Sequence, residues 1–558
     1  MLPVKPCVIV FGATGLFGEL LVRRLAHASQ FVVVGVARNR APLDVLQLDT
    51  GIVTELVDRE DRHSVEDILG RLKPFAVVDC AGPFQYYGDD PYRLARQVLQ
   101  AGSHYIDIAD APSFVVGIAE LDDLARQKNL MAISGASTVP AISAAASDVL
   151  TDSLRRVVAI DTAVIPGNRA KRTLSVMKAI LGQIGQPYQL VRHGKKQTVY
   201  GWGDTRKVNL VLPLEQPVRG RLASLVHTPD VAIFPERYKA ETAATYAGLE
   251  IKTFHRILQL AGRLVRARLI PSLAPFTGIA RFIASGFERI GSDVGGMQVS
   301  VTGESTQGQM LKRTWDLVAS DGRGPEIPTL PVSVLLDKLR LGLFEPGARH
   351  SCGEVTLDDL QSRFDSIGAV TAMTEEELQP IFKTVLGDAF NTLPTPVQTL
   401  HRTCGQSVYR GRAESFGPDG IIGRLAAAVT GFPSASKEIP VEVTITTNST
   451  GELWSRSFNG QVFESHMALH NGGYITERFG PLTMRLGLNI RDNCLHYPVS
   501  SGKVFRFLPI PGVLLPKSIA HESVDSQGRF TFDVRILTPF GGRIAHYRGY
   551  LLNAEQIS

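Results

Sequence analysis

Residues 8–18 read VIVFGATGLFG, and this stretch decides the fold of the first part of the chain. Val8–Phe11 is a short apolar run rich in β-branched residues, which is typical of a strand buried on both faces of a parallel sheet. A glycine-rich turn follows, and apolar residues then recur at helical spacing from Leu20 to Leu25. A strand, a glycine turn and a helix in this order are the setting in which proteins bind a dinucleotide.

The three glycines of the turn have separate expected roles. Gly12 allows the tight turn, Gly15 lets the backbone approach a pyrophosphate, and Gly18 lets helix and strand pack closely. The free N–H groups at the start of the helix would face the pyrophosphate. The predicted phosphate loop is therefore Gly12, Ala13, Thr14, Gly15, Leu16, Phe17 and Gly18. The alternative is a glycine-rich turn without a ligand.

Composition narrows the class of protein. A length of 558 residues implies several domains, and 44% hydrophobic with 20% charged residues is typical of a soluble globular protein. The net charge of +5 is small and no block of like charges occurs, so nucleic-acid binding is not indicated. The five cysteines are scattered, which favours reduced thiols in the cytoplasm. The sequence predicts neither a signal peptide nor a membrane-spanning helix.

The order of strand and helix patterns predicts the domains. Residues 1–145 alternate apolar strands and amphipathic helices, which predicts an α/β fold with a Rossmann-type doubly wound parallel sheet. Residues 146–324 predict an inserted α+β substrate domain with a hairpin at 298–319, and 325–365 return to the first domain. The polar segment 365–380 is the predicted linker. Residues 381–558 predict a mostly antiparallel β domain, with a hairpin that turns at 448–451.

The residues after the second and fourth strands point to the cofactor. Arg38 and Asn39 follow the second strand, where a site for NAD would favour an acidic residue. A guanidinium group binds a 2′-phosphate well, so the sequence favours NADP over NAD. The alternative is that Arg38 is only a solvated residue at the end of a strand. We expect Ala81, Gly82, Pro83 and Phe84 to lie against the ribose and nicotinamide, at the carboxyl edge of the sheet.

A reductase of this kind needs a group that polarises the substrate or donates a proton. The candidates with the best positions are Tyr86 and Tyr87, beyond the fourth strand, and Asp107, within the fifth. His104 and Asp110 are further candidates. The histidines show no metal-ligand spacing, so no metal site is predicted.

Residues 254–290 combine helical apolar patterns with six arginines. One interpretation is a pair of helices that lies on a membrane surface. The other is an ordinary helical hairpin, broken at Pro271 and Pro275, whose arginines are solvated.

Five motifs together resemble one family. GATGLFG (12–18), DCAGPFQYYG (79–88), AGSHYIDIAD (101–110), GASTVPAIS (135–143) and GRGPEIPTLP (322–331) resemble the saccharopine dehydrogenase-like oxidoreductases. The resemblance covers residues 5–365 and implies a substrate domain inserted after the sixth Rossmann strand. Two motifs depart from it, because Ala109-Asp110 stands where the family often has Gly-Glu, and Ser137-Thr138 where it often has Asp-Ser. The C-terminal part resembles an uncharacterised module of bacterial proteins.

These observations predict an NADP-dependent oxidoreductase that reduces a C=O, C=N or activated C=C bond of a small or lipid-like substrate. The alternative is a non-catalytic nucleotide-binding protein whose C-terminal module binds a lipid or a protein. Homodimer formation is compatible with either. Within that module, a set of polar and aromatic residues lines a cavity or serves in sheet packing: Trp454, Arg456, His466, His470 and His496.

Overall fold

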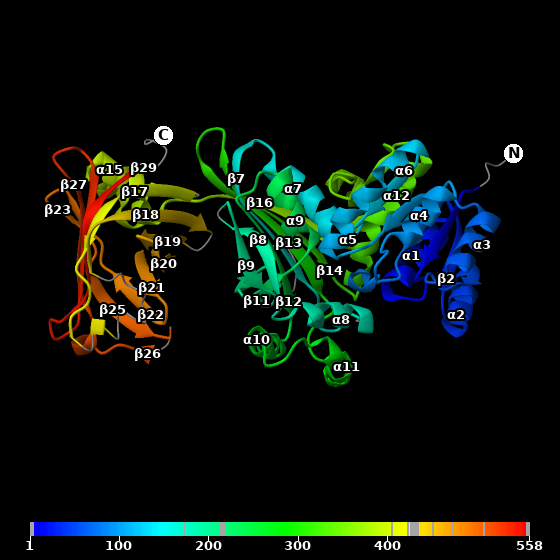
Figure 1. The fold of residues 1–558 in the computed structure, drawn as a ribbon, viewed down its shortest axis with the longest axis horizontal. Helices are drawn as coiled ribbons and strands as arrows, with labels where there is room; N and C mark the ends of the chain where they lie inside the picture. Colours follow the sequence, from blue (N-terminus) through cyan, green and yellow to red (C-terminus); the bar gives the residue numbers. More distant parts are fainter. Residues whose placement is uncertain are drawn as a thin grey trace. The chain divides into compact units, whose positions relative to one another are not determined.

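The computed structural model describes residues 5–171, 173–192, 194–212, 218–402, 406–420, 423–424, 435–448, 451–470, 473–505 and 508–553. The chain forms two compact units (Figure 1). The first comprises the chain up to Val301 together with Arg313–Glu375, and the second comprises Thr302–Lys312 and the chain from Glu376 onward.

The first unit contains a seven-stranded parallel sheet in the order β15-β6-β5-β4-β1-β2-β3. This order confirms the doubly wound fold, with the switch point between β1 and β4. The strands are β1 (Cys7–Phe11), β2 (Val32–Ala37), β3 (Val53–Leu56), β4 (Ala76–Asp79), β5 (His104–Asp107), β6 (Met131–Ser134) and β15 (Gly347–His350). Val8, Ile9 and Val10 are fully buried, as expected for a strand covered on both faces.

The helices that connect these strands, or follow the last of them, match the predicted alternation. They are α1 (Leu16–Ala28), α2 (Arg40–Thr50), α3 (Arg62–Leu72), α4 (Arg93–Gln100), α5 (Pro112–Gly117), α6 (Asp122–Gln127), α7 (Ser143–Thr151), α12 (Leu330–Arg340) and α13 (Leu357–Ser366). The chain leaves the sheet after β6 and returns with β15, which pairs with β6 in parallel.

Most strands of a second sheet lie between β6 and β15 in the sequence, and β16 joins that sheet after β15. The strand order of this sheet is β10-β11-β12-β7-β13-β14-β16. Its strands are β7 (Leu154–Ile165), β10 (Thr205–Val208), β11 (Arg221–Val226), β12 (Thr242–Leu249), β13 (Gly295–Ser305), β14 (Met310–Ala319) and β16 (Val370–Glu377), beside a small hairpin of β8 (Pro187–Arg192) and β9 (Lys195–Tyr200). The helices here are α8 (Leu174–Gln183), α9 (Pro229–Arg237), α10 (Lys252–Arg266) and α11 (Thr277–Ser285). The mixed sheet and its helices confirm an inserted α+β part.

The second unit is a thirteen-stranded sheet in which every described pairing is antiparallel, and this confirms the mostly-β expectation. Its strands are β17 (Gln406–Ser415), β18 (Ser436–Asn448), β19 (Gly451–Phe458), β20 (Gln461–His470), β21 (Tyr474–Phe479), β22 (Leu482–Leu486), β23 (Asn489–Arg491), β24 (Cys494–His496), β25 (Val499–Val504), β26 (Leu508–Pro509), β27 (Lys517–Val524), β28 (Phe530–Leu537) and β29 (Arg543–Asn553). Two short helices, α14 (Ile381–Leu386) and α15 (Thr395–His401), precede them.

The predicted hairpin is formed by β18 and β19, in which Val441 lies opposite Phe458. Ser449 and Thr450 of its expected turn lie outside the described residues. The polar segment 365–380, expected to be a linker, instead contains strand β16, which lies on the edge of the second sheet. Its acidic side chains are exposed, so the acidic composition that suggested a linker belongs to an edge strand.

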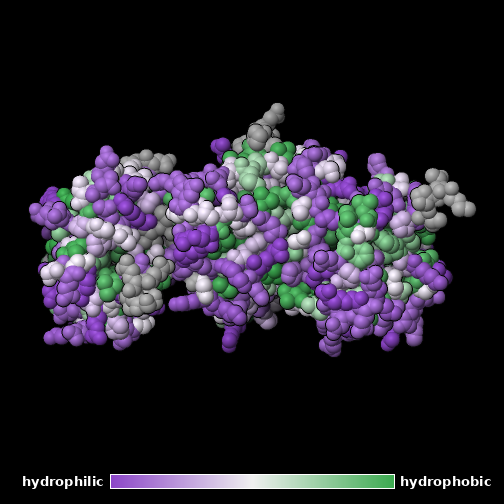
Figure 2. Space-filling model, turned by 90° about the horizontal axis from the view of Figure 1, so that it is seen from above, coloured by the Kyte–Doolittle hydropathy of each residue, from purple (hydrophilic) through white to green (hydrophobic). Residues whose placement is uncertain are grey.

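Polar residues cover most of the face that Figure 2 shows, and hydrophobic residues form smaller patches between them. Ten of the exposed large apolar side chains belong to α10, α11 and the 3-10 turn Ala274–Phe276 with their flanks: Ile257, Leu260, Leu264, Leu269, Phe276, Ile279, Phe282, Ile283, Phe287 and Ile290. We call these ten residues the α10–α11 patch. Both helices lie beyond the ends of β11 and β12 (Figure 1). No helix of the described chain is long and apolar enough to span a membrane.

Candidate cofactor site

The turn between β1 and α1 requires glycine at two positions. Gly12 has a φ of +72°, and a Cβ there would lie 2.7 Å from the backbone of Cys80 and Ala81. A Cβ on Gly18 would lie 2.1 Å from the carbonyl oxygen of Gly12. These two glycines therefore hold the turn against the loop after β4 and hold α1 against β1.

The N-terminus of α1 is open to a ligand. Gly15 is its N-cap residue and supplies no side-chain cap, while the Gly15 N–H donates to the Gly12 carbonyl at 2.9 Å. The first N–H groups of a helix lack partners within the helix and carry a partial positive charge. Because Gly15, Leu16 and Phe17 line a cavity at this point, those N–H groups can bind an anion.

This cavity has a volume of about 600 Å³ and lies at the carboxyl edge of the parallel sheet. Most of the residues predicted for the site line it: Gly12, Thr14, Gly15, Leu16, Phe17, Arg38, Asn39, Ala81, Gly82, Pro83, Phe84, Tyr86 and Tyr87. Ala13, Gly18 and Asp107 do not; Ala13 is buried behind the lining and donates its N–H to the Val36 carbonyl at 3.0 Å. Predicted residues from three separate stretches, 12–17, 38–39 and 81–87, thus meet around one space large enough for part of a dinucleotide.

Cationic side chains lie where β2 and β3 end. Arg38 is exposed at the rim and makes no hydrogen bond or ion pair with any residue that the structure describes. Arg59, which follows β3, pairs with Glu60, and its guanidinium carbon lies 3.2 Å from the centre of the Tyr87 ring. The guanidinium of Arg59 is therefore held in the wall of the cavity by Glu60 and Tyr87, whereas that of Arg38 is available to an anionic ligand.

The hydroxyl of Tyr87 makes a hydrogen bond within the protein. It donates to the carboxylate of the fully buried Asp79 at 3.0 Å, while the Ala81 N–H donates to the same carboxylate at 2.9 Å. Burial raises the pKa of Asp79 above its ordinary value, although these hydrogen bonds oppose the change. The arrangement fixes the loop that carries Ala81 and Gly82, so Tyr87 positions the lining.

Asp107 has a comparable internal position. Its Oδ1 accepts hydrogen bonds from the Ser134 hydroxyl at 2.9 Å, the Gly135 N–H at 2.8 Å and the Ala109 N–H at 2.9 Å. Its Oδ2 is buried and has no partner in the described part of the chain. Burial raises the pKa of Asp107 to about 7, and the three hydrogen bonds only partly offset that effect. In this position the carboxyl group joins the loops that follow β5 and β6.

Tyr86 differs from its neighbour because it is 51% exposed and faces the cavity. The Lys178 ammonium lies 4.4 Å from the centre of its ring, which places a cation beside the phenol. Of the other candidates, Asp110 lines the cavity and accepts a hydrogen bond from Gln85 at 3.0 Å. His104 is buried, and its Nδ1 accepts the Met131 N–H at 3.0 Å, away from the cavity lining.

The wall opposite the glycine loop comes from α8 and its N-cap residue, which the sequence did not indicate. Thr173, Ser175, Val176, Ala179, Ile180 and Gln183 line the cavity from this side. A strand-turn-helix motif marks the nucleotide half of such a site, but no motif marks a wall built by an inserted domain. The contribution of α8 appears only once the fold brings residue 176 near residue 15.

Among the described residues, no three His, Cys, Asp or Glu side chains are grouped as metal ligands would be, and the four described cysteines are free thiols.

A comparison with curated proteins gave no match. Among solved structures, the chain is similar to an apo histidine-tagged saccharopine dehydrogenase (L-Glu forming) from Saccharomyces cerevisiae, with 13% identity and a TM-score of 0.49 over 66% of this chain and 100% of that chain. It is also similar to GenD2 from gentamicin A biosynthesis in complex with NAD, with 14% identity and a TM-score of 0.31 over 67% of this chain and 97% of that one. A probable dehydrogenase from Thermotoga maritima is 9% identical, with a TM-score of 0.31 over 66% of this chain and 98% of that chain. Residues 393–551 match a family model described as a domain of unknown function (DUF4166).

Proposed function

We propose that this protein is a nicotinamide-dependent oxidoreductase that prefers NADP and transfers hydride to a C=O, C=N or activated C=C bond of a small or lipid-like substrate. The observation that carries the proposal is the cavity itself. It combines a glycine loop, an uncapped helix N-terminus and the carboxyl edge of a doubly wound parallel sheet. The bound coenzyme supplies the hydride, and the protein orients it and holds the substrate beside it.

The preference for NADP rests on Arg38. Its guanidinium is exposed at the cavity rim, after β2, without a partner among the described residues. A 2′-phosphate would give it a charge-assisted pair of hydrogen bonds, which the ribose hydroxyl of NAD cannot match. The neighbouring Arg40 does not line the cavity and serves as a matched control.

Titration of the purified protein with NADPH and with NADH, followed by fluorescence, tests this assignment. Arg38→Asp should weaken NADPH binding by about tenfold to a hundredfold and leave NADH binding nearly unchanged. Arg40→Asp should bind both coenzymes like the original protein. Equal losses for both coenzymes in Arg38→Asp would refute the phosphate role, and absence of binding by the original protein would refute the whole proposal.

For the proton donor we propose Tyr86, because its ring faces the cavity beside Lys178 whereas Tyr87 and Asp107 are held by internal hydrogen bonds. Tyr86→Phe removes only the hydroxyl, so it should lower kcat by about a hundredfold or more and leave NADPH affinity intact. Turnover is measured as NADPH oxidation with carbonyl, imine and enoyl substrates. Tight NADPH binding without turnover of any of them would favour the non-catalytic alternative.

A second proposal concerns the α10–α11 patch. Between Lys252 and Ile290 the chain carries seven Lys and Arg side chains and one acid, Glu288, and the six arginines are exposed and are interspersed along the sequence with the ten exposed apolar residues. An exposed apolar surface interspersed with cations is complementary to an anionic lipid surface. We propose that the protein contacts such membranes through this patch, from the reducing cytoplasm that its free thiols fit.

Vesicle flotation distinguishes this contact from a merely solvated hairpin. The protein should float with vesicles that contain an anionic phospholipid and remain behind with neutral vesicles, and added salt should weaken the association. Phe282→Ser should reduce flotation several-fold, because Phe282 is 80% exposed within the patch. Phe540→Ser, at an equally exposed position in the second unit, is the control and should float normally. Equal flotation with both vesicle types, or of both variants, would exclude the proposal.

A further inference from the structure

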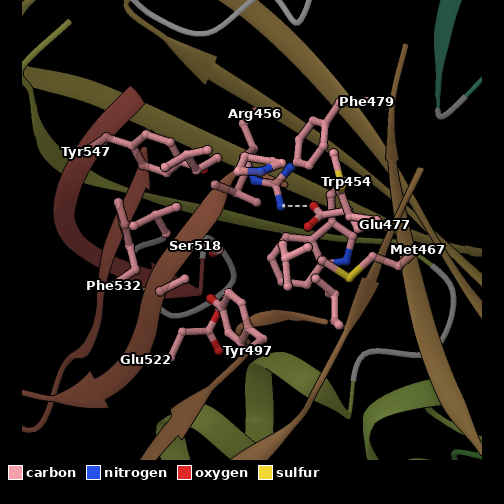
Figure 3. Close-up of a pocket in the computed structure, with 18 of the residues that line it drawn as sticks. Trp454, Arg456, Met467, Glu477, Phe479, Tyr497, Ser518, Glu522, Phe532 and Tyr547 are labelled. Carbon is pink, nitrogen blue, oxygen red and sulfur yellow. Dashed lines mark hydrogen bonds and ion pairs between the residues drawn. The ribbon is translucent and has the colours of Figure 1, made fainter. Parts of the chain in front are cut away.

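The antiparallel sheet of the second unit encloses a cavity of about 110 Å³ (Figure 3). Because side chains alternate between the faces of a strand, every second residue of β19 and β27 points into it. On β19 these are Trp454, Arg456 and Phe458, and on β27 they are Ser518, Ala520 and Glu522. Of the polar residues that composition suggested, Trp454 and Arg456 line the cavity, and His466, His470 and His496 do not.

The lining is almost entirely apolar and includes side chains that can rearrange. Phe530, Phe532 and Ile544 contribute rigid hydrocarbon surface, while Met467 and Met484 contribute unbranched thioethers. A cavity of this size holds a group about as large as a benzene ring. Since methionine side chains change rotamer easily, the space can lengthen around a longer chain.

One polar pair lies within this apolar space. The Arg456 guanidinium donates to the Ser465 hydroxyl at 2.8 Å and forms an ion pair with Glu477 at 3.4 Å (Figure 3). Both side chains are about nine-tenths buried. A buried ion pair contributes little to stability compared with apolar residues of similar size. Stability therefore does not explain this pair, and its place beside a cavity is consistent with a role in ligand binding.

The charged groups of the lining already have partners within the protein. Glu477 neutralises Arg456, and Glu522 accepts a hydrogen bond from Tyr497 at 2.7 Å and lies against the buried His401. A ligand that carried its own charge would bury it here without a free counter-ion, which is costly. A hydroxyl group suits the site better, because its oxygen can accept from the guanidinium and its hydrogen can be donated to the carboxylate.

Exposed apolar side chains lie next to this cavity along the chain. Pro516 and Ser518 line the cavity and are partly exposed. The chain just before them carries Leu508, Val513 and Leu514, which are 54%, 80% and 51% exposed. Exposed apolar side chains at such a point are expected where a hydrophobic molecule enters.

We propose that the second unit binds a neutral, elongated hydrophobic alcohol, with its hydrocarbon part in the cavity and its hydroxyl at the Arg456–Glu477 pair. The proposal does not depend on the cofactor site, because every residue it uses belongs to the second unit.

The test uses the full-length protein without coenzyme and the neutral fluorescent probe N-phenyl-1-naphthylamine. Its fluorescence should rise and saturate with one site per chain. Ser518→Phe places a ring in the cavity and should weaken binding at least tenfold. Ile519→Phe adds the same ring on the outer face of β27, where Ile519 is 55% exposed, and should bind like the original protein. Circular dichroism confirms that both variants are folded.

Competition with two molecules of equal chain length examines the head group. 1-Dodecanol should displace the probe at a concentration at least tenfold lower than dodecanoate at pH 8. This competition measurement uses only the original protein, so it tests the proposal even if Ser518→Phe does not fold. Absence of saturable probe binding, unchanged binding by a folded Ser518→Phe, or equal displacement by alcohol and carboxylate would each overturn the proposal.

Discussion

Tyr87 and Asp107, two of the catalytic candidates from the sequence, lie at or near the ends of neighbouring strands of the parallel sheet, as does Asp79. The structure directs each of these polar groups to an internal partner: Tyr87 to Asp79, and Asp107 to Ser134 and Gly135. Sequence position places a residue at the active edge of the sheet, but it does not say whether the side chain faces the ligand or the loop behind it. Tyr86, one residue away, faces the cavity instead.

The raised pKa of Asp107 makes stability depend on pH. Its folded-state pKa of about 7 lies above the value near 3.9 expected for an unfolded chain, so folding favours the protonated carboxyl. That contribution is complete below pH 4 and is lost as pH rises to 7. Asp107→Asn keeps an oxygen acceptor and cannot ionise. The unfolding free energy of the variant minus that of the original protein should therefore increase between pH 4 and pH 7, by on the order of 4 kcal/mol.

Urea unfolding of both proteins at a series of pH values measures this difference, which should level off above pH 7. A difference that stays constant across the range would mean that Asp107 is ionised throughout. NADPH turnover of the same variant, measured at pH 8, separates structure from chemistry. Retained turnover in a stable Asp107→Asn would agree with a positioning role, and a large loss of kcat alone would assign it a chemical one.

At the scale of elements, the predictable features were those with a strong local signal. Uninterrupted apolar runs predicted β1, β2 and β4, and alternation predicted the β18–β19 hairpin. These predictions were possible because the pattern of apolar residues within a strand shows which of its faces are buried. Strand β16 was missed because it is an exposed edge strand whose acidic residues resemble a linker. The sequence did not identify helix α8 as a wall of the site, because α8 lines the cavity together with residues that are distant from it in the sequence.

The packing of α1 against β1 leads to a second prediction. A Cβ on Gly18 would lie 2.1 Å from a backbone oxygen, whereas a Cβ on Gly15 would lie 3.2 Å from the same Gly12 oxygen, and Gly15 faces the cavity. Gly18→Ala should therefore displace α1 and destabilise the first unit by about 1–3 kcal/mol. Gly15→Ala should leave stability within about 1 kcal/mol and weaken NADPH binding at least tenfold, because its methyl group would occupy the phosphate position.

Thermal unfolding and NADPH titration of the two variants check this contrast, and each variant serves as the control for the other. Should Gly15→Ala bind NADPH as tightly as the original protein, the backbone of this turn would not approach a phosphate.

For the whole molecule, the sequence indicated a change from alternating α/β patterns to β hairpins near residue 381, and the two largest hydrophobic cores follow that change. The first core draws its buried residues from Val8 to Ala369, and the second from Ile381 to Leu551. The sequence could not indicate that the hairpin tip Thr302–Lys312 groups with the second unit, because its residues continue the strand patterns of the first.

Two separate cores predict two unfolding transitions in calorimetry of the full-length protein. NADPH at about a hundred times its Kd should stabilise the unit that binds it by about 2.7 kcal/mol and raise only one transition, by several degrees. Gly18→Ala should lower that same transition and leave the other unchanged, which assigns it to the first unit. 1-Dodecanol should raise only the remaining transition, because the residues proposed to bind it belong to the second unit. A single transition that moved with both ligands would show that the units unfold together, and an NADPH shift of the transition insensitive to Gly18→Ala would place the coenzyme outside the glycine turn.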